Sequence, residues 1–177
     1  MAKVLYDGDA TMRMIARISH EIIERNENPC DIVLIGILRR GACIAKRICE
    51  KIQSITGVKV PVGTLDITLY RDDISGVEDM PKVSSFKVDF DIRGKTVILV
   101  DDVIFTGRTA RAAIEAVFDI DRPRCIQLVE LVDRGHRELP IRPDYVGKNI
   151  PTSLHEIIRL STDEYDGKWC IELDVKE

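Results

Sequence analysis

The chain has 177 residues, of which 45% are hydrophobic and 32% are charged, and its formal net charge is −4. This length fits one domain that buries roughly two-thirds of the surface of the unfolded chain, so folding needs no disulfide or metal. The composition excludes a disordered chain, the short apolar runs exclude a membrane-spanning protein, and the negative charge excludes a global attraction to nucleic acid. We therefore expect a single domain over residues 1–177.

The first residues and the cysteines predict a cytoplasmic protein. Residues 1–9 contain no basic segment followed by a long apolar stretch, so they are not typical of a secretory signal. The five cysteines are odd in number, scattered, and never spaced as Cys-x-x-Cys. This usage argues against both a zinc site and a disulfide framework, and it predicts reduced thiols.

The chain begins with patterns of helix, strand and helix. Isoleucines recur at three- and four-residue steps over residues 11–28, which predicts a helix with Thr11 as its N-cap and Pro29 after its end. The continuous apolar run over residues 31–37 predicts a strand that is covered on both faces, as parallel sheets require. A second helix is expected from residue 42 to about residue 52.

Two further strands and a helix are predicted in the middle of the chain. Residues 58–70 read as a strand region that a proline and a glycine interrupt. Residues 71–91 are polar without apolar periodicity, and so long a loop in a compact domain is usually a lid or a disordered segment. Residues 96–100 predict another buried strand, and a loop then leads into a helix that contains Ala112 and Val117.

The last third predicts one clear strand, over residues 125–132. Residues 133–152 are expected to be irregular because they are rich in glycine, proline and charge, and short strands are candidates at residues 157–160 and 169–173. Strands that alternate with helices predict an α/β fold with a largely parallel sheet. The sequence contains no repeat, linker or sign of a second domain.

Two adjacent carboxylates, Asp101 and Asp102, follow the strand predicted at residues 96–100. They lie where doubly wound sheets bind ligands, and burial of such charges is costly unless they are hydrated or paired. Gly107 can adopt positive φ, and the threonines and free amides at the next helix start can bind phosphate. The carboxylates suit ribose hydroxyls, so this loop predicts a ribose 5-phosphate site. An Asp-Asp pair by itself would favour a plain strand end with Thr106 or Thr109 as a helix cap.

The segment over residues 97–109 resembles the phosphoribosyl-pyrophosphate signature of type I phosphoribosyltransferases. The chain lacks both a P-loop motif and a Gly-x-Gly-x-x-Gly after a strand, which weakens two competing phosphate-binding folds. The resemblance implies a substrate-binding loop, with Asp101 and Asp102 also taking part in catalysis. Its residues are Asp101, Asp102, Val103, Ile104, Phe105, Thr106, Gly107, Arg108 and Thr109.

Three more blocks, over residues 66–73, 131–142 and 145–153, resemble the bacterial family of pyrimidine operon attenuation regulators, and the likeness covers nearly the whole chain. Members of that family bind pyrimidine operon leader mRNA in response to uridine nucleotides, and most also make UMP from uracil and phosphoribosyl pyrophosphate. The resemblance implies a type I phosphoribosyltransferase fold with a flexible flap, binding of UMP or UTP, and a homodimer or higher homo-oligomer. Mg²⁺ would be held mainly by pyrophosphate and ribose oxygens, so no residue is assigned as a metal ligand.

The resemblance also implies a pyrophosphate loop at Arg39, Arg40 and Gly41. Guanidinium groups suit this anion because they offer paired donors and keep their charge. The family commonly has Thr-Arg-Gly here, so Arg39 adds a charge and removes a hydroxyl. An isolated Arg-Arg pair would be read as a solvated loop.

The remaining catalytic and base-binding positions are also carried over from the family. Arg71 would act in catalysis from the start of the flap, which would close over the substrates and exclude water. Arg134 and Ile158 would contact the base. Since the loop at residues 101–109 does not identify the base, a purine-type phosphoribosyltransferase without RNA regulation is the alternative.

Charge counting is weak evidence for an RNA surface. Residues 133–148 carry four cations against three acids, and by composition alone such cations are a solvated surface. The family resemblance implies instead a basic concave face, built by a dimer from the first helix and the block around residue 136. The RNA-binding candidates are Arg17, His20, His136, Arg137, Arg142 and Lys148.

Overall fold

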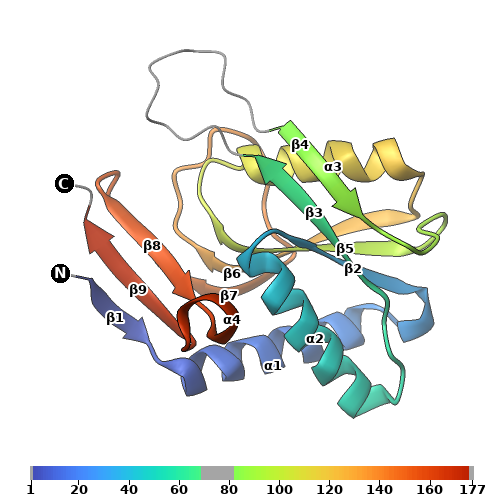
Figure 1. The fold of residues 1–177 in the computed structure, drawn as a ribbon, viewed down its shortest axis with the longest axis horizontal. Helices are drawn as coiled ribbons and strands as arrows, with labels where there is room; N and C mark the ends of the chain where they lie inside the picture. Colours follow the sequence, from blue (N-terminus) through green and yellow to red (C-terminus); the bar gives the residue numbers. More distant parts are fainter. Residues whose placement is uncertain (1, 69–81, 176–177) are drawn as a thin grey trace.

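The computed structural model describes residues 2–68 and 82–175, and in this part of the chain the strands form two sheets. The larger sheet has the strand order β4-β3-β2-β5-β6-β7, and the smaller has the order β1-β9-β8 (Figure 1). The strands are β1 (Lys3–Tyr6), β2 (Ile32–Ile37), β3 (Val62–Thr68), β4 (Lys82–Lys87), β5 (Thr96–Ile104), β6 (Cys125–Asp133), β7 (Tyr145–Asn149), β8 (Glu156–Ser161) and β9 (Cys170–Val175). The helices are α1 (Gly8–Arg25), α2 (Arg40–Thr56), α3 (Arg108–Ile120), α4 (Asp163–Asp166) and the 3-10 turn Pro29–Asp31.

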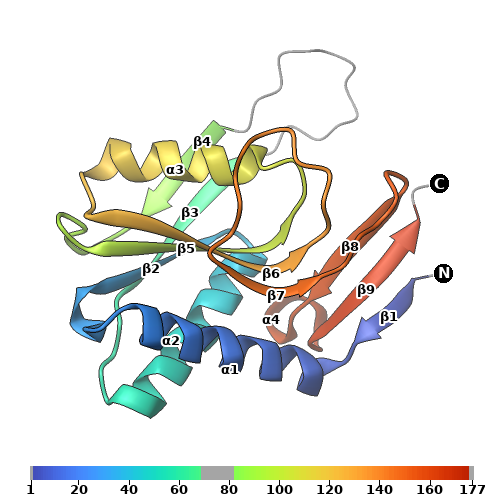
Figure 2. The same ribbon diagram turned by 180° about the vertical axis from the view of Figure 1, so that it is seen from behind.

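Strands β3, β2, β5, β6 and β7 run parallel, which confirms the predicted α/β fold with a largely parallel sheet. Helices α1 and α2 cover one face of this sheet and α3 covers the other (Figures 1 and 2). The central strands are apolar on both faces because each face lies under helices. Ile98 packs in the core beneath α1 and α2, whereas Leu99 packs in the core beneath α3.

Helix α1 begins three residues earlier than predicted, so the assignment of Thr11 as its N-cap was wrong. The N-cap is Asp7, whose Oδ1 accepts a hydrogen bond from the amide of Ala10 at 2.8 Å. Thr11 is buried in the first turn and donates its hydroxyl to the carbonyl of Asp7. The apolar periodicity of the sequence located the helix face, but it could not choose between two residues that both cap helices well.

Two stretches predicted to be irregular contain strands. Strand β4 lies within residues 71–91 and pairs antiparallel with β3 at the edge of the sheet. Strand β7 lies within residues 133–152 and pairs parallel with β6 at the opposite edge. Both are edge strands, so neither needs the continuous apolar pattern that revealed the central strands.

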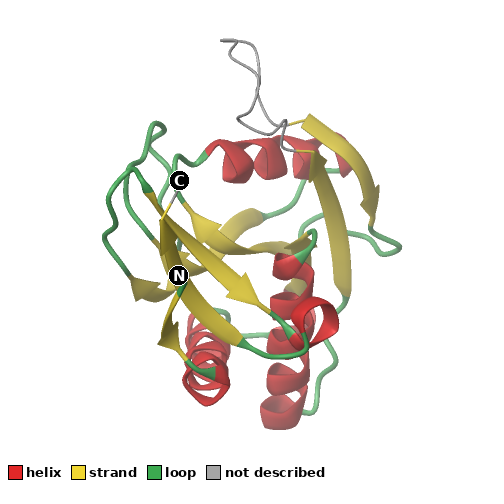
Figure 3. Cartoon of the chain, turned by 60° about the vertical axis from the view of Figure 1, so that its left-hand side comes forward, coloured by secondary structure: helices red, strands yellow, loops and turns green. Residues whose placement is uncertain are grey.

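The small sheet joins the two ends of the chain, because β1 pairs antiparallel with β9 (Figure 3). Strand β9 also pairs with β8, and the connection between these two strands carries α4. The predicted short strands at residues 157–160 and 169–173 are therefore confirmed, whereas β1 had no recognised signal. Among residues 2–68 and 82–175, no helix has the length and hydropathy to cross a membrane.

Candidate active site

Strands β2 and β5 are parallel neighbours, so the loops that follow them leave the large sheet at the same end, the carboxyl end of its parallel strands. Their contact is close: a Cβ atom built on Gly41 would lie 2.3 Å from the carbonyl oxygen of Val100. Only glycine permits this approach of the α2 start to the end of the buried part of β5. The predicted pyrophosphate loop, residues 39–41, and the predicted ribose-phosphate loop, residues 101–109, are therefore direct neighbours.

The ribose-phosphate loop has the backbone that its sequence predicts. Asp101 Oδ1 accepts from the amide of Asp102 at 2.9 Å, and Asp102 Oδ1 accepts from the amide of Val103 at 3.0 Å. Gly107 has φ of 91° and is the N-cap of α3, so its conformation favours glycine. The first amides of a helix have no partner within the helix and can bind an anion; here the amide of Arg108 donates to Thr106 Oγ1 at 3.3 Å.

Burial raises the pKa of both aspartates in this loop. Asp101 is only 9% exposed, and the neighbouring charge of Asp102 raises the pKa of Asp101 further, well above its usual range. Burial likewise raises the pKa of Asp102, but the guanidinium of Arg40 opposes that rise. Donor hydroxyls of a ribose, or a bound cation, would stabilise the charged carboxylates here.

The block at residues 133–139 supports the ribose-phosphate loop from outside. The amides of Arg134 and Glu138 donate to the carbonyls of Ile104 and Thr106, at 3.2 and 2.9 Å. The side chain of Arg137 donates to the carbonyl of Phe105 at 2.9 Å and is paired with Asp133. Two segments that are 30 residues apart in the sequence are thus joined along their main chains.

Phe105 lies between two side chains of that block. The Arg134 guanidinium stacks 4.1 Å from the centre of its ring, and the His136 ring meets it edge-on at 5.7 Å between centroids. Arg134 is buried and donates to Thr152 Oγ1 and to the carbonyl of Ser153, both at 3.0 Å. Burial lowers the pKa of Arg134, because desolvation disfavours its charge.

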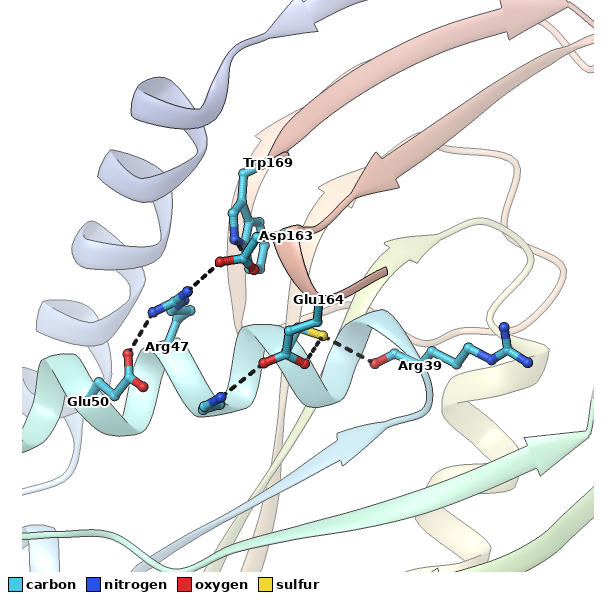
Figure 4. Close-up of polar contacts among 8 residues, drawn as sticks. Arg39, Arg47, Glu50, Asp163, Glu164 and Trp169 are labelled. Atoms are coloured by element: carbon cyan, nitrogen blue, oxygen red, sulfur yellow. Dashed lines mark hydrogen bonds and ion pairs between the residues drawn. The ribbon is translucent and has the colours of Figure 1, made fainter. Parts of the chain in front are cut away.

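The pyrophosphate loop is more open. Arg39 is exposed and Arg40 is partly exposed. Their side chains contact α4, which is distant in the sequence: Arg40 Nη2 lies 3.4 Å from Asp166 Oδ1, and the Arg39 guanidinium lies 6.0 Å from the centre of the Tyr165 ring. Figure 4 shows that Arg47, further along α2, binds Asp163 of α4.

Of the two remaining predicted site residues, Ile158 and Arg71, only Ile158 is among the described residues. Ile158 is buried in β8, in the core beneath α1 and α2. Arg71 lies outside the described residues, as do residues 72–81 of the predicted flap, whereas residues 82–91 are described and contain β4.

Sequence reasoning missed Glu130, a carboxyl that is only 1% exposed and lies in β6 opposite Asp101. Its Oε2 atom has no hydrogen-bond partner among the described residues. Burial raises the pKa of Glu130 well above its usual range, and the charges of Asp101 and Asp102 raise it further. Glu130 could have been recognised in the sequence as a single acidic residue inside the apolar run that forms β6.

The RNA-binding candidates lie mostly on exposed surface. Arg17 and Lys148 line an open groove of about 430 Å³ that Arg13 also borders. The guanidinium of Arg17 donates to the carbonyls of Val146 and Gly147, so it is anchored at the floor of the groove. The side chains of His20, His136, Arg142 and Lys148 belong to exposed residues.

Arg137 differs from the other candidates. Only 19% of its side chain is exposed, and its donors are engaged within residues 105–141. The structure thus gives its guanidinium a supporting role beneath the ribose-phosphate loop.

The sequence matches the phosphoribosyl transferase domain family over residues 1–164. It is 57% identical to the bifunctional protein PyrR of Caldicellulosiruptor bescii, over 93% of this chain and 90% of that protein. It is also 57% identical to the bifunctional protein PyrR of Clostridium botulinum, over 98% of this chain and 96% of that protein.

Among solved structures, a hypoxanthine phosphoribosyl transferase of Trypanosoma cruzi superposes with a TM-score of 0.77 at 20% identity, covering 98% of this chain and 91% of that one. A hypoxanthine phosphoribosyltransferase of Staphylococcus aureus gives a TM-score of 0.71 at 20% identity, with 88% and 80% covered. These two structures confirm the fold. The chain therefore belongs to the phosphoribosyl transferase domain family and, within it, to the PyrR family of bifunctional pyrimidine attenuation regulators and uracil phosphoribosyltransferases.

Proposed function

We propose that the site between the loops after β2 and β5 binds phosphoribosyl pyrophosphate and transfers its ribosyl group to uracil. The observation that carries this proposal is the contact of Gly41 with Val100, which places the arginines of one loop beside the carboxylates of the other. Arg39 and Arg40 would bind pyrophosphate. Asp101 and Asp102 would accept hydrogen bonds from the ribose hydroxyls, and the start of α3 would bind the 5′-phosphate.

The proposed reaction is a substitution at C1 of the ribose. The bond from C1 to uracil N1 forms, the bond from C1 to pyrophosphate breaks with its electron pair leaving on the pyrophosphate oxygen, and the N1 proton passes from uracil to solvent. Positive charge develops on the ribose in the transition state, so nearby carboxylates stabilise it and the arginines stabilise the leaving group. Arg134 and the chain near Ile158 would position the base, and Arg71 would act from the flap.

Mg²⁺ suits this site as a partner of the substrate. No group of three side chains able to hold a metal occurs within residues 2–68 and 82–175, but the carboxylates of Asp101 and Asp102 stand beside the proposed ribose position. Mg²⁺ commonly keeps most of its ligands from phosphates and water. When bound, it would neutralise charge on the departing pyrophosphate.

We also propose that the same site senses UMP or UTP and controls binding of pyrimidine operon leader mRNA. The groove bordered by Arg13, Arg17 and Lys148 supports this role, because Arg13 and Lys148 bring positive charge to it on a protein of net charge −4, although Arg17 is paired with Glu21. His20, His136 and Arg142 would extend this surface. The proposed assembly is a cytoplasmic homodimer or higher homo-oligomer, in which two such surfaces would bind one RNA.

A comparison of bases tests the enzymatic part of the proposal. The purified protein is supplied with phosphoribosyl pyrophosphate and either uracil, hypoxanthine or guanine, and released pyrophosphate is measured. We expect pyrophosphate release when the base is uracil, and none when it is hypoxanthine or guanine. Release with a purine instead would identify a purine-type enzyme. The two hypoxanthine phosphoribosyltransferases that share this fold are enzymes of that type.

Binding of leader RNA with and without UMP tests the regulatory part. We expect Lys148→Ala to weaken binding and to reduce the dependence of log K on log salt by about 0.7 to 0.9, the value for one lost phosphate contact. Lys59→Ala is the matched control, because Lys59 is an exposed lysine outside the groove. Equal effects of the two variants would reject the groove as the RNA surface.

A further inference from the structure

Helix α4 is attached to α2 by side chains from four successive positions of the chain. Glu164 accepts from Lys46 at 3.0 Å and from Cys43 Sγ at 3.0 Å. Asp163 pairs with Arg47 at 2.8 Å and accepts from the indole of Trp169 at 2.8 Å (Figure 4). These contacts hold α4 along α2 and bring its last two residues next to the pyrophosphate loop.

Those last two residues contact the two arginines proposed to bind pyrophosphate. Asp166 lies 3.4 and 3.5 Å from Arg40 Nη2 through its two oxygens, and its Oδ2 is held by the amide of Thr162 at 2.9 Å. The Arg39 guanidinium lies over the Tyr165 ring, at 6.0 Å from its centre.

The geometry around Arg40 is incomplete without a further acceptor. Its distances to Asp166 are long for a charged hydrogen bond, for which about 2.7 to 2.9 Å is usual. Its Nε atom is buried and has no partner among the described residues. A guanidinium in this state satisfies few of its donors, and a bound pyrophosphate would offer several acceptors at once.

We propose that Asp166 is a positioning residue that competes with pyrophosphate for Arg40. This inference rests on the proposed function, because it assumes that both arginines bind pyrophosphate. The carboxylate of Asp166 carries one negative charge and pyrophosphate carries several, so the ligand displaces the contact. The segment between β8 and β9 therefore sets the affinity of the pyrophosphate loop.

The competition has a defined direction. Asp166 holds the Nη2 atom of Arg40 in the free protein, and this nitrogen serves the ligand only after that contact is given up. Loss of the Asp166 charge therefore strengthens pyrophosphate binding. The gain is small, because a partly exposed ion pair changes an equilibrium by about 1.5- to 5-fold.

Titration calorimetry with Mg-pyrophosphate tests the proposal on wild type, Asp166→Asn and Asp163→Asn. The second variant is the matched control, because it removes the same charge from the same helix but its partner Arg47 lies outside the loop. We expect Asp166→Asn to lower the Kd for pyrophosphate by about 1.5- to 5-fold, and to lower the KM for phosphoribosyl pyrophosphate in parallel. Asp163→Asn should leave both near wild type.

Three outcomes overturn the competition. An unchanged Kd in Asp166→Asn, or an equal decrease in both variants, would remove any specific role of Asp166. A higher Kd would mean that Asp166 orients Arg40 for the ligand instead. Asp166→Ser repeats the measurement should the asparagine disturb α4. If wild type itself fails to bind pyrophosphate, the proposed function fails, and this result is distinct from a failure of the competition.

Discussion

The two anion-binding loops of this protein are built in different ways. The ribose-phosphate loop at residues 101–109 is one continuous segment, and main-chain hydrogen bonds from residues 134 and 138 support it. The backbone of Gly41 in the pyrophosphate loop also packs closely on β5, but the side chains of Arg39 and Arg40 have their contacts with α4, over 120 residues away. On the proposed function, the first loop would be fixed before substrate arrives, whereas the second would exchange partners when substrate binds.

This difference matches the tasks proposed for the two loops. Ribose phosphate stays bound through the chemical step, so rigid amides and carboxylates can stabilise the transition state without reorganising. Pyrophosphate must enter with the substrate and leave as product. Partly exposed arginines with a weak internal competitor suit an anion that has to be released.

The largest expected effect comes from the rigid loop. Asp101→Asn and Asp102→Asn each keep the size of the side chain but remove the carboxylate proposed to hold the ribose, and we expect each to reduce UMP formation by on the order of 100-fold. The rate of pyrophosphate release with uracil measures this loss. Asp119→Asn, on the exposed side of α3, is the control for charge. Full activity in both site variants would show that the ribose assignment is wrong.

A smaller effect is expected from the side chain that holds the rigid loop. Arg134→Met removes the stack on Phe105 and the two hydrogen bonds to residues 152 and 153. We expect unfolding in urea to show a loss of about 1 to 3 kcal/mol, as for a buried group left without its partner. Arg122→Met, at an exposed arginine, should change little. If the two variants lost the same stability, Arg134 would have no specific role in holding residues 101–109. The contrast with the pyrophosphate loop would then be weakened.

The contrast between the loops also explains what could be predicted from the sequence. Strands β2 and β5 were visible because each is a local apolar run, and residues 101–109 were visible because the whole loop is contiguous. The N-cap of α1 and the edge strands β4 and β7 were missed, since they lack such local patterns.

Features that depend on how distant segments meet could not be predicted. The position of Glu130 opposite Asp101 follows from the register of β5 with β6, which no local pattern encodes. The contact of Asp166 with Arg40 depends on where the small sheet places α4. In both cases the residue type was plain in the sequence, but its partner was not.

Glu130 provides the most subtle test of the rigid loop, because its carboxyl is buried in the strand next to Asp101 and its Oε2 atom has no hydrogen-bond partner among residues 2–68 and 82–175. Its pKa in the folded protein is raised, by burial first and then by the charges of Asp101 and Asp102, with Asp133 adding to this rise and Arg137 opposing it. The folded protein therefore keeps this proton at pH values where the unfolded chain has lost it. The stability that the protonated group contributes is full below its ordinary pKa, and it is lost as pH rises towards the folded value.

Glu130→Gln should abolish this pH dependence, since glutamine cannot ionise. We compare the free energy of unfolding of the variant with that of wild type. The difference, variant minus wild type, should increase by up to about 1.4 kcal/mol from about pH 5 to about pH 6. Urea unfolding of both proteins at the two pH values measures this difference, and the carboxylates that do not interact with Glu130 cancel in the comparison. A constant difference would mean that Glu130 titrates alike in the folded and unfolded chain. The floor of the ribose-phosphate loop would then be hydrated, and its rigidity would have to come from the main-chain contacts alone.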